Sequence, residues 1–294
     1  MNLRYRAIFS WPILIISYLF LQIVSDLITT SIFGPLSYLS QITATDSQWH
    51  NHIMIAIAES MAMVFIANNS KVSGYQLLFV LASFYWGTKI FMMMIEAVVY
   101  LNIWLTLPLM SMDDVIHTTI NGAINTVLIS SVVIWICNKW QPTESTLIPL
   151  QLSHQLSHHL SITAVIKISL AYVPIYLAAG MFLAMPLGGE AFKQTYGNLV
   201  VPLWMPLFQL ARGLLWALLL WVLFITTKDK VTRPVMAVTL AVFGSVQLLY
   251  PNPFMLEQLR AAHLIEVSVS MAIFGWFAAA IYSKDVKQQI KITT

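Results

Sequence analysis

Three ionisable residues, Arg260, His263 and Glu266, recur at every third position of a segment that is otherwise largely apolar. In a helix, which turns by about 100° per residue, they occupy one face with His263 at its centre. A histidine with a carboxylate one turn away is suited to metal ligation or to proton transfer. The alternative is a structural network in which Arg260 neutralises Glu266 or a carboxylate of a neighbouring helix.

A second polar face contains Lys89 and Glu96, seven residues apart. On a helix this spacing separates them by about 10.5 Å along the axis, too far for a direct ion pair. We therefore expect Glu96 to pair with a charged residue or a histidine of another segment. The candidates are Arg212, Arg260 and His263. Two further charges, Glu59 and Arg212, each stand alone in the middle of an apolar segment.

A third polar face is formed by His117, Asn121 and Asn125, which are spaced four residues apart. Asparagines at this spacing commonly form hydrogen bonds between membrane helices. His117 and His263 are expected at similar depths, so they could also be axial ligands of a haem or ligands of one metal ion. The candidate metal ligands are His117, His263 and Glu266. No cofactor is assigned by the sequence.

Apolar helices must position these residues, because hydrophobic residues make up 59% of the 294 and charged residues only 9%. The mean hydropathy of +0.77 excludes a water-soluble fold. Apolar stretches of the length that crosses a bilayer recur from end to end. The sequence therefore predicts an all-α, polytopic transmembrane bundle of about eight spans. They are 8–32, 51–67, 74–104, 115–137, 163–186, 199–226, 233–250 and 259–283.

The long connection over 138–162 divides the chain into two blocks, 1–137 and 163–294, with four spans each. Leucines spaced four residues apart in this linker are typical of an amphipathic helix lying in the membrane interface. Weak similarity between 112–131 and 255–274 suggests that the blocks are duplicated. With four spans per block, the copies would be parallel repeats.

Lysines and arginines predict the orientation in the membrane. They concentrate at the N-terminus, in the even-numbered turns and at the C-terminus, whereas the opposite loops are mainly acidic. The excess of basic residues on the cytoplasmic side then places both termini in the cytoplasm. The ionisable groups converge on the outer half of the membrane. We expect a bacterial plasma-membrane location, with the lipid bilayer as the only assigned partner; no basic patch suited to nucleic acid is present.

The candidate substrate- or proton-binding residues are Glu59, Glu96, Arg212, Arg260, His263 and Glu266. The function that they favour is a small transporter of a solute or ion, or one coupled to protons. A metal- or haem-dependent membrane enzyme or redox protein is the alternative, and a non-catalytic assembly subunit is another. The sequence has no P-loop, Rossmann glycine motif, HExxH or GxSxG motif, so any energy coupling must use an ion gradient or a separate partner.

Overall fold

The computed structural model describes residues 3–36, 49–99, 111–141, 161–197, 200–250 and 255–293, and these residues contain helices but no strand. Eight of the helical segments are long and apolar enough to cross a membrane. This confirms the predicted all-α, polytopic bundle. The protein is therefore a multi-pass membrane protein. The interfacial helix predicted within the linker falls mainly on residues 142–160, which lie outside the described residues.

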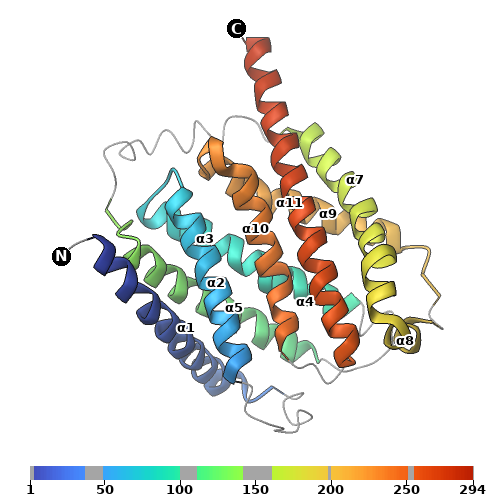
Figure 1. The fold of residues 1–294 in the computed structure, drawn as a ribbon, viewed down its shortest axis with the longest axis horizontal. Coiled ribbons are helices and arrows are strands. Elements are labelled where there is room, and N and C mark those ends of the chain that lie inside the picture. The colour runs from blue at the N-terminus through green and yellow to red at the C-terminus, as the bar shows by residue number, and fades with distance from the viewer. Residues whose placement is uncertain are drawn as a thin grey trace. The chain divides into compact units, whose positions relative to one another are not determined.

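The chain forms two compact units. Unit 1 comprises residues 1–68 and 74–141, and unit 2 comprises residues 69–73 and 142–294. In unit 1 the helices are α1 (Leu3–Phe33), α2 (Trp49–Asn69), α3 (Gly74–Trp86), the π-helical segment η2 (Gly87–Phe91), α4 (Met92–Ala97) and α5 (Met112–Ile136), drawn from blue to green in Figure 1.

Unit 2 contains the helices drawn from yellow-green to red in Figure 1. They are α7 (Ile162–Ala179), the π-helical segment η5 (Gly180–Ala184), α8 (Met185–Tyr196), α9 (Met205–Thr226), the short 3₁₀ segment η6 (Asp229–Val231), α10 (Thr232–Ser245), the 3₁₀ segment η7 (Val246–Leu249) and α11 (Glu257–Thr293). The fifth span is thus built from three consecutive segments, as is the third span in unit 1.

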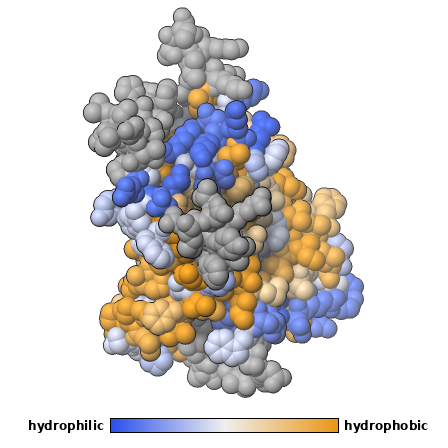
Figure 2. All heavy atoms as spheres, turned by 60° about the vertical axis from the view of Figure 1, so that its left-hand side comes forward, coloured by the Kyte–Doolittle hydropathy of each residue, from blue (hydrophilic) through white to orange (hydrophobic). Residues whose placement is uncertain are grey.

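Large apolar side chains are exposed along the spans, as expected where lipid replaces water. Examples are Phe20 and Leu27 on α1, Phe182 on η5 and Leu207 on α9, all more than 60% exposed. Figure 2 shows broad areas of apolar side chains on the molecular surface. In a bilayer such residues face hydrocarbon, so the exposed surface itself agrees with the transmembrane assignment.

In unit 1, α5 packs against α1, α3 and η2. Its first turn is fixed by a capping box, in which Ser111 and Asp114 satisfy each other's backbone N–H groups. Gly122 allows the close approach to η2, because a Cβ atom there would lie 2.5 Å from Cγ1 of Ile90. A small residue therefore determines how near α5 comes to the π-helical segment.

In unit 2, α11 packs against α10, α7 and α8, and α7 packs against α9. Two glycines permit these contacts. A Cβ on Gly275 of α11 would lie 2.5 Å from the carbonyl oxygen of Met236, and one on Gly213 of α9 would lie 2.7 Å from that of Ser169. Helix association in membranes depends on such close backbone approach, because lipid provides no hydrophobic driving force.

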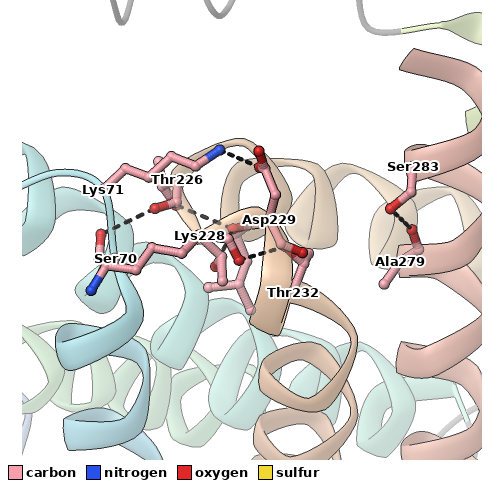
Figure 3. A network of polar contacts seen from close by, with 10 residues as sticks. Ser70, Lys71, Thr226, Lys228, Asp229, Thr232, Ala279 and Ser283 are labelled. Atoms are coloured by element: carbon pink, nitrogen blue, oxygen red, sulfur yellow. Dashed lines mark hydrogen bonds and ion pairs between the residues drawn. The ribbon is translucent and has the colours of Figure 1, made fainter. Parts of the chain in front are cut away.

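The turn at residues 69–73 is paired with the chain at residues 226–229 (Figure 3). Ser70 and Thr227 form an isolated antiparallel β-bridge. The Lys71 amide donates to the Thr226 carbonyl at 2.7 Å, and the Lys228 amide donates to that of Asn69 at 2.9 Å. An ion pair of 2.6 Å joins Lys71 to Asp229. Backbone and side-chain contacts thus connect two turns that are distant in the sequence.

Candidate functional site

The most deeply buried ion pair of the described residues joins Glu59 of α2 to Lys89 of η2 in unit 1. The Lys89 Nζ lies 2.8 Å from both carboxylate oxygens of Glu59. Glu59 is 0% exposed and Lys89 is 8% exposed. Sequence reasoning placed Glu59 among the site residues but left Lys89 without a partner. The sequence could have indicated this pair, because Glu59 and Lys89 are the only mid-span charges of opposite sign in two consecutive spans joined by a short turn.

Two tyrosines complete this group, which we call the Glu59 cluster (Tyr18, Glu59, Tyr85 and Lys89). The hydroxyls of Tyr18 and Tyr85 both donate to Oε2 of Glu59. Lys89 Nζ donates to the same hydroxyl oxygens at 3.0 and 3.1 Å, and the two hydroxyl oxygens are 2.9 Å apart. Three spans therefore supply four interacting polar groups, and Tyr18 was not identified from the sequence at all.

The backbone departs from α-helical geometry where it carries Lys89. The η2 segment closes with a hydrogen bond from the Met92 amide to the Gly87 carbonyl, which is the i to i+5 spacing of a π-helix. Single π-helical turns within α-helices are frequent at functional sites. Lys89 therefore lies in a distorted turn whose geometry differs from that of the helices on either side.

A second group lies in unit 2, and we call it the His263 cluster (Tyr196, His263 and Glu266). His263 Nδ1 is 3.0 Å from Oε2 of Glu266, one turn along α11. The other ring nitrogen, Nε2, is 3.3 Å from the hydroxyl of Tyr196 at the end of α8. Glu266 is 5% exposed. The Glu266 carboxylate thus faces Nδ1 and the Tyr196 hydroxyl faces Nε2, so both ring nitrogens of the imidazole have a polar neighbour.

Arg260 of α11 binds backbone carbonyl groups. Its Nη1 donates to the carbonyl oxygens of Leu248, Leu249 and Tyr250, at 2.9, 3.0 and 3.1 Å. These carbonyls end η7, and a cation is favourable at the carbonyl end of a helix. Arg260 thus caps a helical segment, and the group that faces Glu266 is His263.

Arg212 lies on α9 in an aromatic environment. Its guanidinium carbon is within 6 Å of the ring centroids of Tyr172, Tyr176 and Phe208. Its Nη1 donates to Oε1 of Gln209 at 3.1 Å. Cation–π contacts of this kind stabilise a desolvated guanidinium. Glu96 belongs to unit 1, whereas Arg212, Arg260 and His263 belong to unit 2, so the expected pairing of Glu96 stays a prediction.

Residues of the polar face of α5 contact α1 within unit 1. Asn121 donates through Nδ2 to Asp26 of α1, and the His117 ring lies 6.0 Å from that of Phe33. Among the described residues, no three His, Cys, Asp or Glu side chains are grouped so that they could hold a metal ion. A haem or metal joining His117 to His263 and Glu266 would link the two units and stays a prediction.

Comparison with protein-family models, with curated proteins and with solved structures finds no match for this chain. The functional argument therefore depends on the geometry of the two clusters.

Proposed function

We propose that the protein is a secondary transporter that couples the movement of a small solute or ion to protons. The observation that carries the proposal is the buried Glu59–Lys89 pair, enclosed with two tyrosine hydroxyls in the interior of a multi-pass membrane protein. Ionisable residues in transmembrane segments are usually associated with substrate, ion or proton pathways.

Energetics favour an active role for this pair. A charge in the middle of a membrane helix costs at least about 2.5 to 3.5 kcal/mol. Replacing a buried ion pair by well-packed apolar residues is often neutral or stabilising. A contribution to folding stability therefore does not by itself explain the pair. Its presence where three spans converge is more easily explained if its change of charge is used.

The chemistry begins with the carboxylate of Glu59, which accepts hydrogen bonds from Lys89, Tyr18 and Tyr85. A proton arriving at Glu59 removes the negative charge and leaves Lys89 as an uncompensated cation. The protein must then admit an anion, release the lysine's proton or rearrange the spans. Proton binding and conformation are linked by this requirement, as proton-coupled transport needs.

We place the protein in a bacterial plasma membrane with both termini in the cytoplasm. Exposed bases gather at the paired turns, which supports assigning these turns to the cytoplasmic side. They are Lys71, Lys228, Lys230 and Arg233. Labelling of single cysteines at positions 71 and 230 in intact cells, with a reagent that does not cross the membrane, tests this orientation.

Proton movement into liposomes containing the purified protein tests the transport proposal. An internal pH dye reports proton flux while gradients of sodium chloride, glucose, alanine and pyruvate are imposed in turn. We expect at least one gradient to drive protons in the wild type and not in Glu59→Gln. Fluxes equal to those of protein-free liposomes for every solute would refute transport. An unchanged flux in Glu59→Gln would remove Glu59 from the mechanism.

A further inference from the structure

We infer that the transported solute is a small carboxylate anion that binds Lys89, Tyr18 and Tyr85 in place of the Glu59 carboxylate; this rests on the proposed function. The three donors already converge on one carboxylate, with the lysine Nζ 3.0 and 3.1 Å from the two hydroxyl oxygens. An ammonium and two hydroxyls provide the charge and the hydrogen bonds that a carboxylate requires. The group that they hold in this structure belongs to the protein itself.

Charge neutrality explains why such an anion would need a proton. With Glu59 ionised and Lys89 protonated, the cluster has no net charge. An incoming monoanion alone would bury one negative charge in a medium of low dielectric constant. If a proton binds to Glu59 as the anion arrives, the cluster is neutral again, because the anion now balances Lys89. One proton and one monoanion therefore move together, and no covalent bond is made or broken.

A cationic solute fits the cluster less well. A cation that approaches Glu59 would lie beside the ammonium of Lys89, which occupies the positions 2.8 Å from both carboxylate oxygens. It would add a second positive charge unless the lysine lost its proton. A neutral solute would leave a proton bound to Glu59 without a compensating anion. The arrangement thus favours an anion over the other two classes.

Radiolabelled pyruvate uptake into liposomes, driven by an inward proton gradient with the membrane potential clamped at zero, tests this inference. We expect acceleration in the wild type, at least tenfold loss in Lys89→Met, and loss of the response to pH in Glu59→Gln. Ser60→Ala, an adjacent buried residue of α2, is the matched control. Succinate and glutamate extend the carboxylate panel.

Proton flux driven only by glucose, alanine or sodium would overturn the anion inference but would still support a proton-coupled transporter. Absence of flux with every solute would refute both.

Independent observations lead us to propose also that α2–α3 and α9–α10 are two copies of one helical hairpin. Shifted by 159 positions, residues 65–84 and 224–243 are identical at seven of twenty positions. The motif around the turn is the clearest part, since Phe65-Ile66 and Lys71-Val72 recur as Phe224-Ile225 and Lys230-Val231. This register differs from the one that relates 112–131 to 255–274, because the connection before the last span is shorter in the second block.

The structure keeps the same register in two further ways. Helix α3 ends at Trp86 and α10 ends at Ser245, and each is followed at once by a segment that is not α-helical, η2 and η7. In the antiparallel pairing of the turns, Ser70 opposite Thr227 places Asn69 opposite Lys228. Those two residues are also 159 apart. The local twofold axis of the bridge therefore passes between equivalent residues of the two turns.

Under this duplication, only the first hairpin carries the residues of the Glu59 cluster. The positions equivalent to Glu59 and Lys89 are Leu218 and Leu248, and Gly244 stands in the place of Tyr85. Leucines thus occupy both positions in the second hairpin, so its two helices form without an ion pair at these positions. The hairpin itself does not require the charges, so the first copy carries a specialised site.

The double variant Glu59→Leu/Lys89→Leu imposes the second copy's residues on the first. We expect it to fold with a melting temperature close to that of the wild type and to lose proton-coupled flux. We also expect Asn69→Cys/Lys228→Cys, made with Cys137→Ser, to form a disulfide on oxidation, whereas Asn69→Cys/Val238→Cys, with the second cysteine ten residues further along unit 2, should not. An unfolded double-leucine variant would overturn the equivalence of the hairpins. Labelling of Lys71→Cys and Lys230→Cys from opposite sides of the membrane would do so as well.

Discussion

The Glu59 cluster collects its side chains from three spans of unit 1, whereas His263 and Glu266 lie one turn apart on a single helix of unit 2. Glu59 and Lys89 bind each other and both contact the hydroxyls of Tyr18 and Tyr85. The His263 cluster adds only one group from another element, the Tyr196 hydroxyl at 3.3 Å. The first cluster therefore depends on tertiary packing, and the second depends mainly on helix periodicity.

This difference bears on what each cluster can do. A lysine–glutamate pair with no net charge changes its charge only when a proton or another ion enters. The His263 cluster offers an imidazole and one hydroxyl beside its carboxylate, and it therefore has fewer donors for an anion than an ammonium with two hydroxyls. We therefore expect the Glu59 cluster to govern coupling.

The largest effect should come from breaking the Glu59 pair on one side. Lys89→Met leaves the buried carboxylate without its cation, which typically destabilises a protein by about 3 to 5 kcal/mol. The double variant Glu59→Leu/Lys89→Leu should recover most of that loss, because no buried charge remains. Denaturant unfolding in detergent micelles measures both. Equal stabilities of the single and double variants would show that the charges are not energetically coupled.

Removing the carboxylate of the second cluster should cost less. Glu266→Gln keeps the side-chain size but loses a hydrogen bond to a group that can be charged, worth about 1.5 to 3 kcal/mol. The His263 side chain is 19% exposed, so solvent should reduce the loss toward the lower figure. A double-mutant cycle with His263→Ala measures the interaction by unfolding. A coupling energy as large as that of Glu59 and Lys89 would remove the distinction between the clusters.

Removing single hydroxyls should sharpen the comparison further. Tyr18→Phe and Tyr85→Phe each remove a hydroxyl that donates to Glu59 and accepts from Lys89, with an expected loss of about 1 kcal/mol per hydroxyl. Tyr196→Phe is the matched change in the other cluster and should cost less, since its contact is longer and partly exposed. Unfolding in the same micelles gives all three values. A larger loss for Tyr196→Phe would reverse our ranking of the two clusters.

The smallest effect concerns Cys137, the single cysteine of the wild-type sequence. Burial raises the pKa of its thiol to about 11, so the reactive thiolate is a minor species at neutral pH. We expect its iodoacetamide reaction to accelerate about tenfold per pH unit from pH 7 to 10 without levelling off. A plateau near pH 9, as an exposed thiol would give, contradicts this.

Much of the fold could be predicted because the bilayer imposes a simple length and polarity requirement on each span. The eight apolar segments were identified to within a few residues at most ends. Helix α11 continues to Thr293, beyond the predicted end at 283, because its last residues are polar but remain good helix formers. The π-helical segments at 87–91 and 180–184 were not predicted, since backbone distortion of this kind leaves no clear periodic signal.

The sequence by itself determined the number of spans and the proximity of His263 to Glu266, because helix geometry fixes which side chains lie one turn apart. Only the tertiary structure decided that Glu59 meets Lys89, that Tyr18 and Tyr85 enclose them, and that Arg260 binds carbonyl groups at the end of η7. These contacts join residues between 10 and 71 positions apart. Their geometry depends on how helices rotate and pack against one another, which local spacing does not encode.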